Sequence, residues 1–168
     1  MEHSGVLYIV AGGAEPVARV SGLVDAALGR GWDTCLVLTP TAARWLDAEV
    51  PALARRTGHP VRSAYKLPGD PDVLPEADAM IVAPATFNMI NQWAAGISES
   101  LALGLINEAL GRGIPIAAAP WVNGPLSRHP AYGASLDRLR GAGVTIVVPG
   151  PEGLAWTSIL DAVAAAPA

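Results

Sequence analysis

A hydroxyl and a side-chain amide stand just after a long apolar run, in the segment Pro84-Ala85-Thr86-Phe87-Asn88. The apolar run predicts a buried strand, and the residues after it have the spacing of an amphipathic helix. Neutral hydrogen-bonding groups at the start of a helix can bind a phosphate or the polar ring atoms of a nucleotide. The segment therefore predicts a nucleotide site, with helix capping by the same side chains as the structural alternative.

Small or neutral polar residues also follow three other apolar runs. Each of these turns offers backbone N–H groups, hydroxyls or amides, and almost no formal charge. Two structural alternatives stay open, because a tight turn needs glycine in any case and a threonine can simply cap a helix. The segments are Gly12-Gly13-Ala14, Thr39-Pro40-Thr41 and Pro120-Trp121-Val122-Asn123-Gly124.

The first two of these turns favour a mononucleotide over NAD(P). A dinucleotide-binding Rossmann unit carries G-x-G-x-x-G after its first strand and an acidic residue at the end of its second strand. This chain has Gly12-Gly13-Ala14 at the first place, and threonines, Thr39 and Thr41, at the second. The chain thus offers one phosphate-type turn and no acid for the ribose of a dinucleotide.

An alternation of strands and helices along the chain must position these turns. The expected strands are continuously apolar, which predicts a parallel sheet covered on both faces, and ligands of such sheets bind beyond the carboxyl ends of the strands. We predict one α/β domain over residues 1–168, with a three-layer Rossmann-like or flavodoxin-like fold and a six-stranded, mostly parallel sheet. The expected strands are residues 5–12, 34–40, 60–65, 77–83, 114–120 and 144–150, and the expected helices 15–30, 41–56 (broken or bent near Pro51), 88–110, 134–142 and 152–165.

Composition excludes several other classes of protein. The chain is 51% hydrophobic and 15% charged, which argues against disorder, and its net charge of −4 with a single lysine, Lys66, argues against nucleic acid. One cysteine, Cys35, excludes an internal disulfide framework and a cysteine-based zinc site, and its place inside an apolar run predicts a buried hydrophobic role. No apolar stretch reaches membrane-spanning length. We expect a soluble, cytoplasmic protein with no metal, nucleic-acid or membrane partner.

The segment that begins at Pro84 resembles a signature of the homo-oligomeric flavin-containing cysteine decarboxylases. That family includes phosphopantothenoylcysteine decarboxylase and the peptidyl-cysteine decarboxylases, and its pattern is P-A-[ST]-x-N-[TS] followed by G-I-x-[DE]-x-L. The resemblance extends over nearly the whole chain. The matching segments are Pro84-Ala85-Thr86-Phe87-Asn88-Met89 and Gly96-Ile97-Ser98-Glu99-Ser100-Leu101, at the family's spacing and without a gap.

The resemblance implies a non-covalent FMN, held at an interface between the subunits of a homotrimer or a multiple of one. The helix that starts at Asn88 would pack at that contact, and Asn123 would hydrogen-bond the carboxylate or carbonyl of a small-molecule or peptide substrate. A single phosphate-type turn favours FMN over FAD. Gly13 and Thr39 would lie near the phosphate, and Thr86 and Asn88 near the flavin or its ribityl chain. The full set of expected cofactor-binding residues is Gly12, Gly13, Ala14, Thr39, Thr41, Pro84, Ala85, Thr86 and Asn88.

The chain departs from the family at two places that matter for chemistry. The family's catalytic histidine lies fourteen positions before the proline of the signature, and Asp70 stands there in a Pro/Gly/Asp-rich loop. The Met-Trp pair that follows the substrate asparagine is replaced by Leu126-Ser127, and His129 in the same loop is a candidate substitute acid–base group. Asp70 could act as a base, or it could be only a solvated turn residue.

These departures leave three functional hypotheses open. The first is an FMN enzyme that oxidises and decarboxylates a cysteine-containing peptide or small molecule, with Asp70, Asn123 and His129 as catalytic residues. The second is an FMN-dependent oxidoreductase or flavin-modifying enzyme on the same fold. The third is a non-catalytic FMN-binding regulatory protein.

Overall fold

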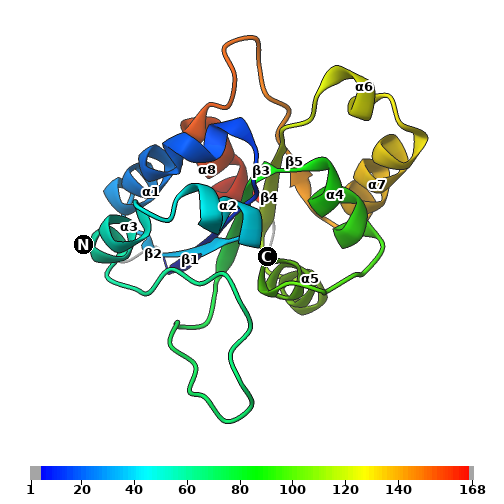
Figure 1. Ribbon diagram of the computed structural model, residues 1–168. Helices are drawn as coiled ribbons and strands as arrows, with labels where there is room; N and C mark the ends of the chain where they lie inside the picture. Colours follow the sequence, from blue (N-terminus) through cyan, green and yellow to red (C-terminus); the bar gives the residue numbers. More distant parts are fainter. Residues whose placement is uncertain (1–4, 167–168) are drawn as a thin grey trace.

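Five parallel strands form the central sheet of the computed structural model, which describes residues 5–166 (Figure 1). Their order is β2-β1-β3-β4-β5. The first strand of the chain, β1, therefore lies inside the sheet, with β2 at one edge and β3, β4 and β5 in succession on the other side. Because every pair runs parallel, the carboxyl ends of all strands lie at the same edge of the sheet. The strands are β1 (Val6–Ala11), β2 (Asp33–Leu38), β3 (Ala79–Ala85), β4 (Ile116–Pro120) and β5 (Thr145–Ile146).

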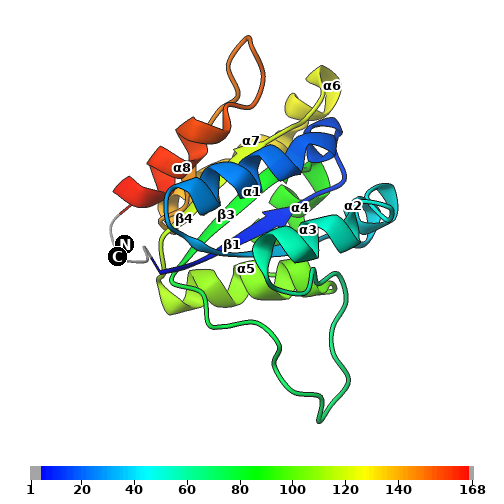
Figure 2. The ribbon, with the colours of Figure 1, turned by 90° about the vertical axis from the view of Figure 1, so that its left-hand side faces the viewer.

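Helices cover both faces of this sheet. From the side, α1 and α8 lie over one face and α5 over the other (Figure 2). The predicted α/β fold with helices on both faces is thus confirmed. The helices are η1 (Glu15–Arg19, a 3-10 helix), α1 (Val20–Gly29), α2 (Pro40–Trp45), α3 (Val50–Thr57), α4 (Phe87–Ala94), α5 (Leu101–Arg112), α6 (Gly124–Ser127), α7 (Pro130–Gly141) and α8 (Trp156–Ala165).

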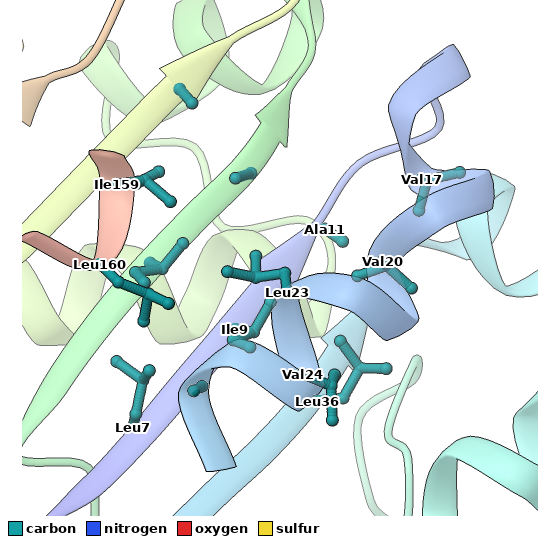
Figure 3. Packing of buried hydrophobic residues seen from close by; sticks show 14 of the residues in the cluster. Leu7, Ile9, Ala11, Val17, Val20, Leu23, Val24, Leu36, Ile159 and Leu160 are labelled. Atoms are coloured by element: carbon teal, nitrogen blue, oxygen red, sulfur yellow. The ribbon is translucent and has the colours of Figure 1, made fainter. Parts of the chain in front are cut away.

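The continuous apolarity of the strands follows from the two cores that they separate. Successive side chains of a strand point to opposite faces. Leu7 and Ile9 of β1 therefore pack with α1 and α8 (Figure 3), while Tyr8 and Val10 pack with α4, α5 and α7. All seven residues of β3 are buried, as expected for the strand at the centre of the sheet.

The prediction of a sixth strand over residues 60–65 is wrong. That segment makes a single parallel bridge beside β2, in which the Leu38 N–H donates to the Arg62 carbonyl (2.8 Å) and the Arg62 N–H to the Leu36 carbonyl (3.2 Å). Pro60 has no N–H to extend this pairing, and the chain then turns away into the loop of residues 66–78. The expected last strand, 144–150, is reduced to the two residues of β5.

Two expected helices are each divided in two. The expected break in the span 41–56 lies at residues 46–49, between α2 and α3, rather than at Pro51, which lies in the first turn of α3, where proline is tolerated. The span 88–110 becomes α4 and α5, and Gly96 in the break has a φ of +73°, a conformation that favours glycine. Among the helices of residues 5–166, none combines the length and apolarity that crossing a bilayer requires.

Candidate functional site

Two adjoining hollows lie beyond the carboxyl ends of β1, β2, β3 and β4. One of about 510 Å³ reaches from Gly13 to the start of α5, and one of about 650 Å³ reaches from Gly13 to α6. Both are lined by Gly13, Thr86 and Asn88, so we describe them together as the edge cleft. The structure thus brings the following predicted residues into one cleft: Gly13, Ala14, Thr39, Thr41, Thr86, Asn88 and Asn123.

Three further predicted residues lie directly beneath the cleft rather than lining it. Gly12 donates its N–H to the Pro84 carbonyl (2.9 Å), and the Trp121 N–H donates to the Ala85 carbonyl (2.8 Å). These bonds connect the exits of β1, β3 and β4 to one another. The floor of the edge cleft is therefore a hydrogen-bonded extension of the sheet.

Both glycines after β1 are required by close packing. A Cβ on Gly12 would lie 2.5 Å from the Met89 sulfur and 2.9 Å from the Pro84 carbonyl oxygen. A Cβ on Gly13 would lie 2.5 Å from the Thr41 Cγ2 atom. Distances this short force the surrounding atoms to move, so the glycines let β1 approach α2 and α4 closely and keep the cleft open.

Three threonine hydroxyls line the cleft, and each already accepts one hydrogen bond. Thr39 accepts from the Ala42 N–H (3.3 Å) and caps α2, and Thr86 accepts from the Met89 N–H (3.2 Å) and caps α4. Thr41 accepts from the Arg44 guanidinium (3.3 Å). A hydroxyl has one proton to donate besides its lone pairs. Capping therefore orients Thr39 and Thr86, the Arg44 contact orients Thr41, and each of the three hydroxyls keeps an O–H that can donate to an anion.

Asn88 is an exposed residue at the second position of α4 and borders both parts of the cleft. Its side-chain amide makes no hydrogen bond within residues 5–166, so a donor and an acceptor are available to a ligand. Asn123 caps α6, where its Oδ1 accepts from the Leu126 N–H (3.0 Å) and its NH₂ group stays available. The cleft thus presents neutral groups of both hydrogen-bonding types.

His129 stands beside the cleft and caps α7. Its Nδ1 accepts from the Ala131 N–H (3.1 Å), so the proton of the neutral ring is on Nε2. The ring meets Phe87 edge-on, with the ring centroids 5.7 Å apart. Phe87, which lines the cleft, also stacks on Tyr132 at 6.1 Å, and burial raises the pKa of the Tyr132 hydroxyl.

The structure does not bring Asp70 to the edge cleft. Asp70 is exposed in the 66–78 loop, which extends away from the body of the protein (Figures 1 and 2). Its carboxylate accepts from the Leu67 N–H (3.0 Å), and Lys66 Nζ donates to its carbonyl (2.9 Å). These are the contacts of a turn residue, and the hollow that it lines is formed by residues 61–67, 70, 71 and 73.

Four polar residues of the cleft wall are absent from the predicted site: Glu15, Gln92, Glu99 and Ser100. Gln92 hydrogen-bonds Glu99, and Ser100 accepts from the Leu103 N–H (3.3 Å) as the cap of α5. A sequence signal existed for two of them. Gln92 follows Asn88 by four residues and so shares its helix face, and Glu99 is the acidic position of the G-I-x-[DE]-x-L pattern.

The helix that was expected at a subunit contact is covered within the protomer. Met89 and Trp93 of α4 are buried, and α4 packs against α5 and α7. Ile97, just after α4, is 43% exposed. The expected trimer stays a prediction. Within the described part of the chain, His, Cys, Asp and Glu side chains form no group that could hold a metal ion.

Comparison with protein families gives a match over residues 2–166 to the family described as Flavoprotein. Two relatives are also similar in sequence. A cysteine/cysteine sulfinic acid decarboxylase from an unknown prokaryotic organism is 35% identical over 79 residues, and the coenzyme A biosynthesis bifunctional protein CoaBC of Bacillus subtilis (strain 168) is 28% identical over 156 residues. These matches cover 47% and 89% of this chain, but only 21% and 37% of the relatives' own length.

Solved structures share the fold along nearly the whole chain. The FMN-dependent cysteine decarboxylase SpaF superposes with a TM-score of 0.80 at 22% identity, over 96% of both chains. MrsD from Bacillus sp. HIL-Y85/54728 gives a TM-score of 0.78 at 19% identity, over 94% of this chain and 93% of that one. A phosphopantothenoylcysteine (PPC) decarboxylase mutant complexed with pantothenoylaminoethenethiol gives 0.76 at 20% identity, over 97% of both.

Proposed function

The chain belongs to the Flavoprotein family, and from that premise we propose that the edge cleft binds FMN and uses it to decarboxylate a C-terminal cysteine oxidatively. The observation that carries the proposal is the donor set of the cleft. Three threonine hydroxyls and the amides of Asn88 and Asn123 surround a space of a size typical for cofactor sites. SpaF, described as an FMN-dependent cysteine decarboxylase, has the same fold, which supports the choice of cofactor and reaction.

The residues at the β1, β2 and β3 exits fit an FMN phosphate. Gly13 lines this end of the cleft, and Thr39, Thr41 and Thr86 each retain an O–H that can donate to phosphate oxygens. The Arg44 guanidinium beside Thr41 adds a positive charge near this end of the cleft. The phosphate would therefore lie against these residues, and the ribityl chain and ring would extend past Asn88.

The proposed reaction uses the cofactor as electron acceptor and side chains of this chain as hydrogen-bond donors and acid–base groups. When bound, FMN supplies an acceptor for the two electrons that leave the Cα/Cβ–thiol unit of the cysteine. The Asn123 NH₂ group is held by the α6 cap and can donate to the substrate carboxylate or carbonyl. His129 presents an Nε2–H beside Phe87, which lines the cleft, so it is one acid–base candidate, and Asp70 is the candidate from the loop.

Anaerobic mixing with cysteine-ended peptides tests this function. The FMN-loaded protein should lose the absorbance of oxidised flavin and release carbon dioxide, while the same peptide ending in serine should do neither. A flavin that stays oxidised with every cysteine-ended peptide and small thiol would contradict the decarboxylase assignment. Variants of Asn123, His129 and Asp70 would then be measured under the same conditions to assign their roles.

A second candidate function is an FMN-dependent oxidoreductase or a non-catalytic FMN-binding protein. The observation in its favour is that Asp70, which the resemblance places at the position of the family histidine, is an exposed turn residue outside the edge cleft. Reduction of the flavin by NAD(P)H or a small thiol without carbon dioxide release would support the oxidoreductase. Tight FMN binding with no reduction by any of these donors would support the non-catalytic protein.

We also propose that the protein assembles as a homotrimer or a multiple of one, on the strength of the family resemblance. Among residues 5–166, seven large apolar side chains are exposed, and oligomer contacts commonly cover such residues. Light scattering at low protein concentration would measure the mass. A monomer that still holds its flavin would contradict the proposal.

A further inference from the structure

The connection between α4 and α5 forms one wall of the edge cleft, although most of it is exposed. Glu99 and Ser100 of this connection line the cleft, and residues 95–99 are all exposed. A segment without buried side chains has little packing to hold it, so its position depends on hydrogen bonds from its neighbours. The shape of the cleft on this side therefore depends on the groups that bond the 95–100 segment.

Tyr65 supplies one of these hydrogen bonds, although it lines neither part of the cleft. Its hydroxyl donates to the Ser98 carbonyl (2.9 Å). Tyr65 follows Arg62, whose backbone pairs with β2, so this bond connects the segment to the edge strand of the sheet. Asn107 of α5 supplies two more bonds, because its Nδ2 donates to the Ser98 hydroxyl (3.0 Å) and to the carbonyl before Ser98 (3.0 Å). Tyr65 and Asn107 together fix the middle of the 95–100 segment.

Gly104 of α5 makes room for the Tyr65 side chain. It is buried inside the helix, where glycine is less favourable than alanine and so indicates a packing requirement. A Cβ on Gly104 would lie 2.2 Å from the Tyr65 hydroxyl oxygen and 3.1 Å from its Cζ atom. The tyrosine hydroxyl thus occupies the space that an alanine methyl group would take, and this contact sets its position beside the Ser98 carbonyl.

We propose that Tyr65 is a positioning residue of the cofactor site, which holds the 95–100 segment in place as a wall against which FMN binds. This inference rests on the proposed function and adds to it a residue that does not itself line the cleft. The Glu99 carboxylate is bonded by Gln92 of α4, and Tyr65 fixes the backbone directly before Glu99. Without the Tyr65 hydroxyl, the wall is free to move away from the cofactor, so the protein holds FMN less tightly.

Two tyrosine-to-phenylalanine variants test this role by flavin fluorescence titration. Each removes one hydroxyl that donates to a backbone carbonyl: Tyr65→Phe at Ser98 (2.9 Å), and Tyr8→Phe at Pro75 (2.7 Å), which lies outside the edge cleft. Tyr65→Phe should bind FMN about threefold to tenfold more weakly than the parent, the range expected for one hydrogen bond. Tyr8→Phe should lower stability and keep the parent's FMN affinity. Equal affinity of Tyr65→Phe and the parent, or an equal loss in both variants, overturns the inference.

A double-mutant cycle at Gly104 tests the contact by urea unfolding of the whole chain without added FMN. Gly104→Ala should lower the urea midpoint, and in separate titrations the FMN affinity, because the new methyl group displaces the Tyr65 hydroxyl. In a Tyr65→Ala background the same substitution should lower neither any further, because the space is empty and alanine favours the helix. Gly111→Ala is the matched control in α5, since a Cβ there meets nothing within 4 Å. An equal loss from Gly104→Ala in both backgrounds refutes the proposed contact.

Failure of this inference can be told apart from failure of the proposed function. FMN binding by the parent protein is measured first, and the variants are then compared with it. A parent that binds FMN, with Tyr65→Phe binding it as tightly, keeps the cofactor site and loses Tyr65 as its positioning residue. A parent that binds no FMN loses the proposed function and this inference together.

Discussion

The carboxyl edge of the sheet and the 66–78 loop were both expected to supply site residues, and they are built in opposite ways. At the edge, strands exit into capped helices, and the side chains of Thr39 and Thr86 are oriented by backbone N–H groups. In the loop, Asp70 is exposed and bonded mainly to its own neighbours, Lys66 and Leu67. The conformation of the edge is determined by contacts with the rest of the fold, whereas the conformation of the loop is determined by its own turn contacts.

This difference separates cofactor binding from acid–base chemistry. Groups that must match a fixed ligand lie where burial and capping determine their positions, and a change there should affect affinity strongly. A loop with few buried contacts can move or change sequence with little effect on the sheet. The predictions below test whether the edge is as rigid, and the loop as independent, as this comparison implies.

The largest expected contrast concerns thiol reactivity. Cys35 lies fully buried in β2, and burial, with a smaller effect of Asp33, raises its pKa to about 12. The thiolate fraction near pH 8 should then be about a thousandfold below that of the unfolded chain, so the native protein should not react with a thiol reagent. A Leu67→Cys variant in a Cys35→Ala background should react at once. Rapid labelling of native Cys35 would contradict a closed sheet.

The same pKa shift predicts how stability depends on pH. Because the folded-state pKa of Cys35 is raised above its ordinary value of 9.0, its contribution to stability is complete below pH 9 and is lost as pH rises through about 12. Tyr8 acts in the same direction, since burial raises its pKa from 10.0 to about 12. Urea unfolding of Cys35→Ala should show a smaller loss of stability between pH 9 and pH 10 than the parent.

Crowding at Gly12 should give the largest mutational effect on folding. Gly12→Ala places a Cβ against the Pro84 carbonyl and the Met89 sulfur, and we expect a loss of about 1–3 kcal/mol in the free energy of unfolding, with weaker FMN binding. Gly111→Ala is the control, because a Cβ there meets nothing within 4 Å and alanine favours the α5 helix. Urea unfolding measures both. A fully stable Gly12→Ala would contradict the tight strand exit.

Removing the Asn88 amide should weaken cofactor binding without unfolding the protein. Asn88→Ala leaves polar flavin atoms without a partner, so FMN affinity should fall about tenfold to a hundredfold, measured by flavin fluorescence titration. Asn91→Ala is the control on the same helix, because Asn91 bonds the Ser135 hydroxyl and does not line the cleft. It should lower stability and keep the affinity. Unchanged FMN binding by Asn88→Ala would refute the assignment at its most specific residue.

The smallest expected effect on binding is in the loop. Asp70→Asn should leave FMN affinity nearly unchanged, because Asp70 lies outside the edge cleft. If the same variant abolishes turnover of an accepted substrate, Asp70 is the acid–base group and the loop takes part in the reaction. Full activity would leave Asp70 as a turn residue and direct attention to His129→Gln. A large loss of FMN affinity in Asp70→Asn would show that the two regions are not independent.

The sequence predicted the structure best in the segments whose residue pattern follows from a single cause, burial on both faces of the sheet. Long apolar runs that end in small or hydroxyl residues located β1, β3 and β4 and the edge cleft, because burial on both faces of a parallel sheet leaves that pattern. The segment 60–65 has a strand-like composition, but pairing needs a partner and successive N–H groups, and Pro60 lacks one. Counting residues placed Asp70 at the histidine position, yet a count does not determine where a loop lies in space.

The measurement that tests the central claim most directly is the identity of the bound cofactor. The purified protein is denatured by heat, and the mass of the released chromophore is determined; an unloaded sample is then mixed with FMN. We predict a yellow protein, a released compound with the mass of FMN, and uptake of added FMN by the unloaded sample. A colourless protein that fails to take up FMN, or a compound with the mass of FAD, would contradict the account.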